Sequence, residues 1–404
     1  MNNSQTLLAK VVWERLRPSF WPIRLSDLPP NTFLVGGCVR DALLNKLAPK
    51  PDVDFIFQNN ILRFLEELAE KEGGSVVILD AERQIFRLVL HGWTFDFARQ
   101  VGNSLEEDLL RRDFTLNAIA LTITGKPKLF DPLGGIKDIN NKNIVAISQI
   151  NLIEDPIRML RAIRFICQYN FQLENRTKNF IRLNYQGIIK AKKERIKAEI
   201  LKISSAEWTE SYIDLIQDLD IFRFWRDQDI GSQEKNKSDY LIDNKLFTPT
   251  ETYLSLPIIR LVRFLSDQGL FELGFSRRDI KLCRLLRKWQ RKNDGLGFET
   301  LCEEDRLELH IDLEQILPAL IIDLPLSNQK PWLDRWRDPL DPLFHPCSPL
   351  DGFALQKALS LAPGPRLGLL MRYLTKEKAF GRLNSKQQAI DLAWSWSEQK
   401  QPFL

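Results

Sequence analysis

The sequence predicts an α+β protein, in which residues 1–150 form a mixed α/β domain and the residues that follow are all helical. Up to residue 150, short runs rich in β-branched and aromatic residues alternate with segments of helical periodicity. From Glu154 almost to the C-terminus, apolar residues recur only with a helical period. At roughly 100–200 residues per domain, a chain of 404 residues is expected to form about two to four domains.

The predicted α/β domain opens with alternating strands and helices. Residues 32–36 end in glycine and predict a strand that leads into a helix over residues 38–46. Residues 52–57 predict a second strand, and residues 60–71 a second helix. β-branched and aromatic residues predict three more strands, at residues 75–79, 85–90 and 94–98.

The remainder of the chain carries amphipathic helical patterns separated by polar stretches. Residues 192–203 and 276–292 predict two of these helices. The polar stretches 227–239 and 327–331 are expected to be linkers or long loops. An earlier helix is predicted by one apolar stripe with arginines beside it: Ile157, Leu160, Ile163 and Ile166.

The composition argues against several classes of protein. The five cysteines include no C-x-x-C pair, which indicates neither a zinc site nor a disulfide framework and favours a reducing compartment. No apolar run approaches the ~20 residues that span a bilayer, and residues 1–10 lack the pattern of a secretory signal. The three histidines share no local motif, so chemistry based on histidine is not expected. We therefore expect a cytoplasmic protein without a membrane partner.

Positive charge is concentrated in one short segment. Residues 151–202 hold 12 basic and 5 acidic side chains, whereas residues 1–150 hold 18 of each and residues 203–404 hold 27 basic and 30 acidic ones. Such a surplus is expected where a protein grips a polyanion, and a solvated lysine-rich helix face is the alternative. The same two interpretations apply to residues 277–292, which contain eight basic residues, one acidic residue and Trp289.

Two carboxylates alternate along the second predicted strand. Because alternate side chains of a strand share a face, Asp52 and Asp54 point to one side and the apolar residues between and after them to the other. Adjacent carboxylates repel each other unless a cation lies between them, and oxygen ligands suit Mg²⁺. Asp96, in the strand over residues 94–98, could add a third carboxylate. An Asp-x-Asp pair by itself is more often an ordinary turn or surface feature.

The segment Gly36-Gly37-Cys-Val-Arg40-Asp41 lies where the first predicted strand meets its helix. Glycines let the backbone approach an anion, the helix N-terminus offers free N–H groups, and Arg40 adds a guanidinium for phosphate. The spacing matches neither the P-loop nor the Rossmann pattern. The alternative is a tight turn in which Arg40 pairs with Asp41 or faces solvent.

A third polar segment is Arg111-Arg112-Asp113-Phe-Thr-Leu-Asn117. Two arginines, an aspartate and an asparagine suit contacts to phosphates and sugar hydroxyls. Alternatively, the two arginines pair with acidic residues just before them: Glu106, Glu107 and Asp108.

A fourth polar segment begins at Glu154 and continues into the helix with the apolar stripe. A spacing of three residues places Asp155, Arg158, Arg161 and Arg164 along one edge of that helix. Locally, Asp155 followed by proline resembles a helix N-cap with proline at the first helical position. The two roles are compatible because one carboxylate has two oxygens.

Taken together and in this order, these segments resemble the class II tRNA nucleotidyltransferase and poly(A) polymerase family. The resemblance covers roughly the first half of the chain, and the helical second half carries no matching motif. Glu194-Arg195-Ile196 with Glu199 looks like a later helical motif of the family. The matching stretches are Leu34-Val-Gly-Gly-Cys-Val-Arg-Asp-Ala-Leu-Leu44, Asp52-Val-Asp54, Arg111-Arg-Asp-Phe-Thr-Leu-Asn-Ala118, Asp131-Pro-Leu-Gly-Gly-Ile-Lys-Asp138 and Glu154-Asp-Pro-Ile-Arg-Met-Leu-Arg-Ala-Ile-Arg-Phe165.

The resemblance implies a nucleotidyltransferase head over residues 1–150, a base-selecting neck over 151–205, and an all-α body and tail over 206–404 that bind tRNA. It implies that catalysis uses Mg²⁺ held by Asp52 and Asp54, with Asp96 assisting. The other candidate residues would bind the nucleotide: Gly37 and Arg40 its triphosphate, Arg112, Asp113 and Asn117 its sugar and phosphates, Asp155 and Arg158 its base, and Arg161 and Arg164 the rest of it.

The implied reaction is template-independent addition of C and/or A residues of the CCA end to tRNA, from CTP and/or ATP. Cytosine and adenine each present an amino donor beside a ring-nitrogen acceptor, which the carboxylate of Asp155 and the guanidinium of Arg158 complement. Uracil and guanine would place a carbonyl against the carboxylate and be rejected. The sequence does not predict an oligomeric state.

One departure from the family bears on the product. Only residues 98–103 separate Asp96-Phe97 from Ser104, whereas family members that add the whole CCA end usually carry a longer mobile loop here. The short connection argues against addition of the whole CCA end and leaves open a partial activity that adds only CC or only A. A poly(A) polymerase and a non-catalytic RNA-binding relative are the alternatives, and the intact Asp52, Asp54 and Arg112 argue against the second.

Overall fold

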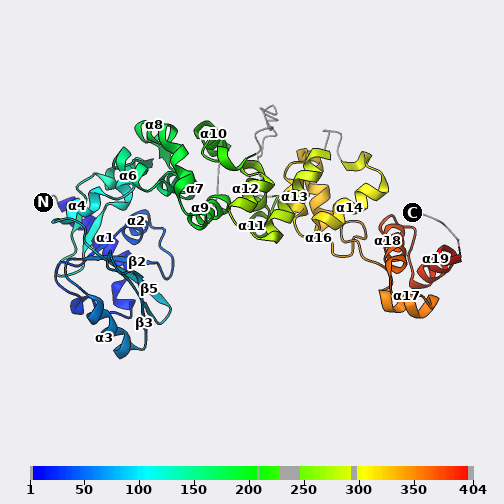
Figure 1. The fold of residues 1–404 in the computed structure, drawn as a ribbon, viewed down its shortest axis with the longest axis horizontal. Coiled ribbons are helices and arrows are strands. Elements are labelled where there is room, and N and C mark those ends of the chain that lie inside the picture. Colours follow the sequence, from blue (N-terminus) through cyan, green and yellow to red (C-terminus); the bar gives the residue numbers. More distant parts are fainter. Residues whose placement is uncertain (1–2, 207–209, 227–245, 293–297, 399–404) are drawn as a thin grey trace. The chain divides into compact units, whose positions relative to one another are not determined.

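The computed structural model describes residues 3–206, 210–226, 246–292 and 298–398 (Figure 1). Seven strands form one sheet in the order β3-β4-β5-β2-β1-β6-β7, in which β2 and β5 are parallel and all other neighbours antiparallel. In sheet order, the strands are β3 Ser75–Asp80, β4 Ile85–Leu90, β5 Trp93–Arg99, β2 Val53–Phe57, β1 Phe33–Val35, β6 Ala120–Thr122 and β7 Leu129–Phe130.

The sheet buries an aromatic core on one face. Phe55 and Phe57 of β2 are fully buried, and the ring of Phe55 stacks on that of Phe97 in β5 with centroids 4.9 Å apart. Asp54 and Asp96 alternate with these rings and therefore lie on the opposite face. The predicted alternation along both strands is confirmed.

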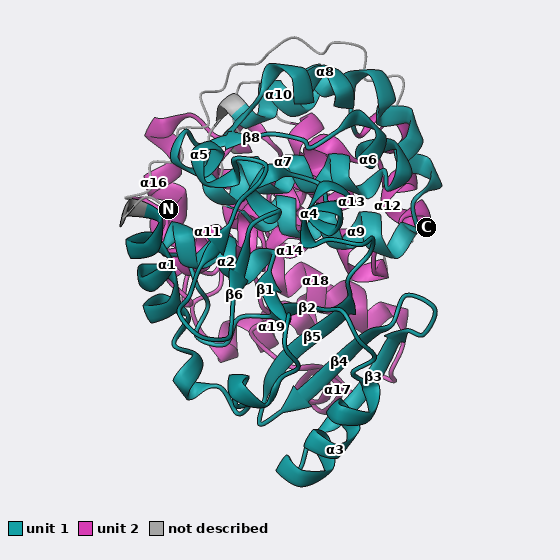
Figure 2. Ribbon diagram, turned by 90° about the vertical axis from the view of Figure 1, so that its left-hand side faces the viewer, with its two compact units in different colours: residues 1–221 teal, residues 222–404 magenta. Residues whose placement is uncertain are grey.

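The chain divides into two compact units, Met1–Ile221 and Phe222–Leu404 (Figure 2). In the first unit, a two-stranded parallel sheet pairs β8 (Asn143–Ile144) with β9 (Gln172–Leu173), and the apolar stripe predicted along α7 is buried. Its helices are α1 Asn3–Leu16, α2 Gly37–Leu44, α3 Leu62–Glu72, α4 Leu105–Leu110, α5 Gly135–Asn140, α6 Gln149–Glu154, α7 Ile157–Tyr169, α8 Asn175–Asn184, α9 Lys193–Ser205 and α10 Glu210–Leu219.

The described part of the second unit is built from helices that enclose two hydrophobic clusters, one around Trp289 and Leu320 and the other around Leu370. The predicted α+β class, with a mixed head followed by helices, is therefore confirmed. The helices are α11 Pro249–Phe264, α12 Asp267–Glu272, α13 Arg277–Lys292, α14 Glu303–Leu313, α15 Leu317–Ile321, α16 Leu326–Arg337, α17 Gly352–Leu359, α18 Pro365–Ala379 and α19 Lys386–Glu398.

The loop predicted at residues 327–331 is wrong, because these residues belong to α16. One face of this helix is buried although the segment is mostly polar. Trp332 and Leu333, which follow it, pack in the core, and the Gln329 amide donates hydrogen bonds to the carbonyls of Ile322 and Leu324. Tertiary packing thus maintains a helix across Pro331, where local preference disfavours one. The linker expected at residues 227–239 lies outside the described residues.

None of the helices in the described ranges is long and apolar enough to cross a membrane.

Candidate functional site

Two parallel strands bring the acidic candidates together. Asp54 of β2 lies directly opposite Asp96 of β5, and Asp52 precedes β2 by one residue. Burial, together with the negative charges of Asp96 and Asp52, raises the pKa of Asp54 to about 6, although the Arg112 guanidinium opposes the shift. A cation bound beside Asp54 would relieve this repulsion. The carboxylates of Asp54 and the nearby Asp52 fit a Mg²⁺ site that takes further ligands from water and substrate phosphates.

Arg87 of β4 forms an ion pair with the carboxylate of Asp96. The two residues face each other across the antiparallel strands, and the Arg87 guanidinium donates two hydrogen bonds of 2.8 Å to the two carboxylate oxygens. Within the described part of the chain, no three His, Cys, Asp or Glu side chains are grouped so that they could hold a metal ion together. Asp96 therefore adds negative charge beside Asp54 while its own oxygens are engaged by Arg87.

Gly36, at the turn from β1 into α2, lies against the acidic site. Its φ of +74° belongs to the left-handed region, where glycine is favoured. An ideal Cβ at this position would be 3.2 Å from Asp54 Oδ2 and 3.4 Å from Arg112 Nη1. Gly37 follows as the first residue of α2, so its N–H belongs to the free donors of a helix N-terminus. Asp54, Arg112 and the start of α2 therefore converge.

Arg112 has an unused donor in this site. Its Nη2 lies 3.4 Å from Asp108 Oδ2, whereas the Nε is buried and has no hydrogen-bond partner among the described residues. Buried donors without partners are rare in folded proteins, and an anionic ligand would satisfy this one. Arg111, by contrast, pairs closely with Asp108 at 2.7 Å, as the local alternative predicted.

A chain of hydrogen bonds links four of the other candidates. Arg40 Nη1 donates to Asn117 Oδ1 at 2.6 Å, and Asn117 Nδ2 donates to Asp113 Oδ1 at 2.9 Å. Arg161 Nε donates to Asp113 Oδ2 at 2.7 Å. Although burial opposes ionisation of Asp113, the Arg161 guanidinium and the hydrogen bonds from Asn117 and the Phe114 N–H hold its pKa below the ordinary value. These bonds fix Arg40 and Arg161 relative to each other.

Arg40 is also paired locally, as the alternative predicted. Its Nε and Nη2 donate to the Asp41 carboxylate at 2.9 and 3.0 Å, and Tyr169 donates its hydroxyl to the same carboxylate at 2.8 Å. The guanidinium carbon lies 5.0 Å from the ring centroids of both Phe165 and Tyr169. Tyr169 was not identified from the sequence, where it is one more aromatic residue of the apolar α7.

Asp155 and Arg158 flank the start of α7. The Asp155 carboxylate accepts hydrogen bonds of 3.0 and 2.8 Å from Arg195 of α9. The predicted N-cap is wrong: Pro156 holds that position without a side-chain cap, and Asp155 instead reaches across to α9. Arg158 Nη1 donates to the main-chain carbonyl of Asn151 at 3.0 Å. Burial lowers the pKa of Arg158 despite the neighbouring carboxylates.

Arg164 lies deeper along α7 and pairs with Glu199 of α9 at 2.7 Å. The structure therefore ties two of the predicted arginines of α7, Arg161 and Arg164, to internal carboxylates. Glu199 is buried, so this pair joins α7 to α9.

Four further residues support the site and were not assigned a role from the sequence. Each of them is hydrogen-bonded to one candidate residue or its neighbour: Arg87 to Asp96, Asn151 to Arg158, Tyr169 to Asp41 and Arg195 to Asp155. A strand pattern could have placed Arg87 on the face of Asp96, because both alternate with buried residues. The other three contacts join segments that have no common pattern in the sequence.

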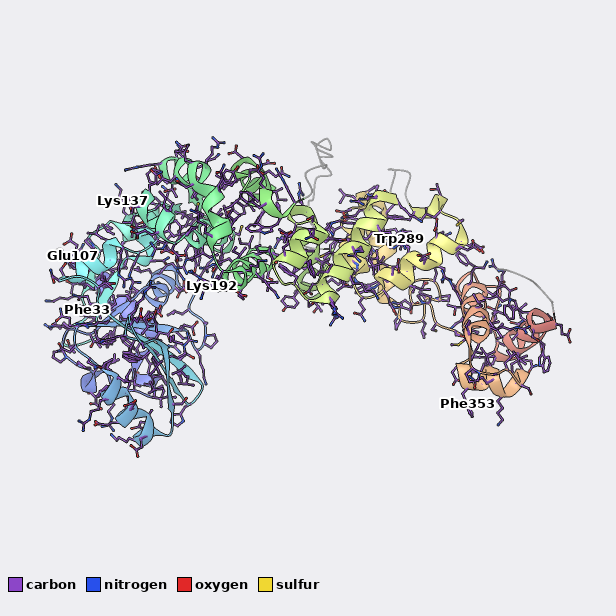
Figure 3. All side chains as sticks on the ribbon, viewed as in Figure 1. Phe33, Glu107, Lys137, Lys192, Trp289 and Phe353 are labelled. Atoms are coloured by element: carbon purple, nitrogen blue, oxygen red, sulfur yellow. The ribbon has the colours of Figure 1, made fainter. Side chains whose placement is uncertain are left out.

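Main-chain N–H groups in the connection from β5 to α4 donate hydrogen bonds to one main-chain carbonyl and two carboxylates. The Gln100 N–H donates to the Phe57 carbonyl at 2.8 Å, the Val101 N–H to Asp108 Oδ1 at 2.9 Å, and the Asn103 N–H to Glu107 Oε2 at 2.8 Å (Glu107 is labelled in Figure 3). Only Gln100–Ser104 separate the strand from the helix, and their donors are largely used locally.

Helix α13 of the second unit carries the predicted basic segment. Trp289, labelled in Figure 3, is fully buried and donates its indole N–H to Asp312. Lys288 pairs with Glu308 and Asp312, and Lys292 pairs with Asp305. The amphipathic interpretation therefore accounts for these residues, and a phosphate contact by α13 stays a prediction.

Known proteins resemble this chain in sequence and in fold. A model of the poly(A) polymerase head domain matches residues 32–145. A CC-adding tRNA nucleotidyltransferase of Synechocystis sp. is 40% identical over 178 residues, which are 44% of this chain and 42% of that protein. The alignment thus spans about two fifths of that relative's length.

Two further comparisons extend over nearly the whole chain. An A-adding tRNA nucleotidyltransferase of Deinococcus radiodurans is 26% identical over 93% of this chain and 98% of its own length. The structure of the Thermotoga maritima CCA-adding enzyme complexed with tRNA superposes with a TM-score of 0.69 at 19% identity, covering 98% of this chain and 95% of that one. At this identity the likeness establishes the fold.

Proposed function

We propose that this chain, a member of the class II tRNA nucleotidyltransferase and poly(A) polymerase family, adds nucleotides of the CCA end to tRNA from CTP and/or ATP without a template. The observation that carries the proposal is the convergence of Asp54, Arg112 and the start of α2 around Gly36. In this proposal, residues 1–150 are the catalytic head, residues 151–205 the neck that selects the base, and residues 206–404 the body and tail that contact tRNA.

Nucleotidyltransferases of this family use divalent metals. We propose Mg²⁺ as the metal and Asp52 and Asp54 as the residues that hold it. Asp96 assists by adding negative charge, while its carboxylate is paired with Arg87. When bound, Mg²⁺ lowers the pKa of the attacking 3′-hydroxyl and neutralises charge on the leaving pyrophosphate.

The remaining residues bind and orient the triphosphate. In the reaction, the 3′-oxygen of tRNA forms a bond to the α-phosphorus, the bond to pyrophosphate breaks, and the hydroxyl proton is released. We infer that the Gly37 N–H, Arg40 and Arg112 donate to phosphate oxygens, because Gly37 opens α2 and the Arg112 Nε has no partner among the described residues. Asp113 and Asn117 hold Arg40 and Arg161 in place, and we infer that they act on the sugar and phosphates through these arginines.

Base selection rests on Asp155 and Arg158. A carboxylate that accepts from an exocyclic amino group and a guanidinium that donates to a ring nitrogen fit cytosine and adenine. Uracil places a carbonyl oxygen against the carboxylate of Asp155, so that two acceptors face each other. Uracil is rejected because these polar groups then stay unpaired. Arg195 keeps the Asp155 carboxylate oriented for this contact.

Among the partial activities, CC addition has the better support. The connection Gln100–Ser104 is short and internally bonded, unlike the longer mobile loop usual in family members that add all three nucleotides. The Synechocystis relative, which is named for CC addition, is 40% identical over a stretch of 178 residues. A-only addition is the remaining alternative.

The test uses three tRNA transcripts that lack the last three, the last two or only the last nucleotide of the CCA end. Each is incubated with the protein, Mg²⁺ and one labelled nucleoside triphosphate. We expect CMP on the first two transcripts and no AMP on the third. No incorporation from CTP or ATP, or equal use of UTP and GTP, contradicts the proposal, and a long A tail identifies a poly(A) polymerase.

The matched variant is Asp54→Asn, which removes the charge but keeps the shape of the side chain. We expect it to abolish incorporation without lowering the melting temperature, because burial already disfavours the ionised carboxylate. Retained activity in this variant would remove Asp54 from the reaction.

A further inference from the structure

Asn151 bridges two parts of the proposed nucleotide site. It lies in α6, is 7% exposed, and donates from its side-chain Nδ2 to the main-chain carbonyls of Leu110 at 2.8 Å and Arg112 at 2.7 Å. Both Nδ2 protons are therefore used on the segment that carries Arg112. Asn151 thus joins α6 to the main chain of the segment that contains Arg112, which we propose binds phosphate.

The main chain of Asn151 is hydrogen-bonded to the two residues that we propose select the base, Asp155 and Arg158. The Asn151 carbonyl accepts a hydrogen bond of 3.0 Å from Nη1 of Arg158 and one of 3.4 Å from the N–H of Asp155. Its own N–H is fixed by Ser148 Oγ, which caps α6 and accepts at 3.1 Å. A single buried residue is therefore bonded directly to Arg158 and Asp155 and to the segment of Arg112.

We propose that Asn151 is a positioning residue that fixes Arg158 relative to Arg112 and thereby determines which base is accepted. The inference rests on the proposed nucleotidyl transfer and deepens it. A guanidinium recognises a base edge only when its donors face the ring nitrogen within hydrogen-bond range, so a displacement of about 1 Å weakens selection. Asn151 itself reaches the nucleotide only through Arg158 and Asp155.

The test compares CTP with UTP in wild type and in Asn151→Ala. In the variant, the two carbonyls lose their donor and α6 is released from the Arg112 segment, so the main-chain carbonyl that binds Arg158 is no longer fixed relative to Arg112. We expect the ratio of kcat/KM for CTP to that for UTP to fall about tenfold, as for the loss of one hydrogen bond to a charged group. We expect the change to lie mainly in KM for CTP.

A purely structural role gives a different result. Loss of folded enzyme lowers kcat for every nucleotide equally and leaves the ratio unchanged, and that outcome overturns the inference. Asn184→Ala is the matched control, because Asn184 Nδ2 also donates to a main-chain carbonyl, that of Phe180 at 2.7 Å, but at the end of α8. We expect it to keep the wild-type ratio.

A second measurement keeps the test decisive. In an Arg158→Ala background, Asn151→Ala should not lower the ratio further, whereas an additional loss of similar size would show that Asn151 does not act through Arg158. If thermal unfolding shows that Asn151→Ala does not fold, Asn151→Ser, whose hydroxyl can still donate to one carbonyl, takes its place in both comparisons. If wild type incorporates neither CMP nor AMP, the proposed function fails and this inference with it.

Discussion

Arg195 holds the carboxylate of Asp155 through two hydrogen bonds, of 3.0 Å from Nη1 and 2.8 Å from Nη2. The two side chains are 52% and 30% exposed, and ion pairs of this exposure contribute little to stability. The pair therefore serves mainly to orient the carboxylate oxygens of Asp155. The two hydrogen bonds from Arg195 also use some of the oxygen lone pairs that could otherwise accept from the base. A change at position 195 should alter nucleotide selection more than folding.

Arg195→Gln tests this relationship. Without the guanidinium, the carboxylate rotates freely, so we expect kcat/KM for CTP to fall about tenfold, while the already poor use of UTP changes little. Steady-state incorporation into tRNA with each nucleotide measures the effect. Arg182→Gln is the control, because Arg182 of α8 forms a similarly exposed pair with Asp218 of α10. Equal losses for CTP and UTP in Arg195→Gln would contradict the role assigned to Arg195.

Gly36→Ala should inactivate the enzyme through crowding at the site. The new Cβ would lie 3.2 Å from Asp54 Oδ2, which must shift by a few tenths of an ångström, and 3.4 Å from Arg112 Nη1, at the limit of ordinary contact. With the left-handed backbone added, we expect about 1–2 kcal/mol lower stability and about a 100-fold loss of kcat/KM. Urea unfolding and the incorporation assay measure the two effects separately.

Gly125→Ala separates the two contributions to that result. Gly125 has a comparable φ of +70°, but no atom lies within 4 Å of an ideal Cβ there. We expect a similar loss of stability with unchanged activity. If Gly36→Ala behaves in the same way, the close approach of Asp54 and Arg112 to Gly36 is not needed for activity.

Period-two and helical patterns predicted most of the framework that carries the site. The alternation around Asp54 and Asp96 correctly placed both carboxylates on one face of adjacent strands, because burial of the phenylalanines between them leaves no other orientation. The prediction from polar composition failed at residues 327–331, which belong to α16, where Gln329 and the following Trp332 are buried. Composition describes such a segment poorly because its buried residues are a minority.

The partners of the site residues were harder to predict. Asp155 and Arg195 are 40 residues apart, and their contact depends on how α9 packs against α7, which no local pattern specifies. Asn151 binds through main-chain carbonyls, so its partners could be almost any residues. Arg87 required the register of β4 against β5, which is set by the tight turn between them.

His310 of α14 gives the second unit a predictable dependence on pH. The ring is 2% exposed, lies 4.1 Å from the Phe344 ring and 5.6 Å from the Trp332 ring, and its Nδ1 has no partner within the described ranges. Burial, together with the positive charges of Arg335 and Arg306, lowers the pKa of His310 to about 3. Folding therefore keeps this imidazole neutral where an unfolded chain would protonate it.

The sign of the effect follows from proton binding. Between pH 6.5 and about 3, the unfolded chain binds a proton at His310 that the folded chain does not, so stability falls as the pH falls, by about 1.4 kcal/mol per pH unit from this group. His310→Gln cannot bind that proton, and we expect its stability to depend less steeply on pH by this amount in urea unfolding between pH 4.5 and 6. His91→Asn, at an exposed turn, is the control and should keep the wild-type slope. If His310→Gln keeps that slope as well, the imidazole is protonated in the folded protein.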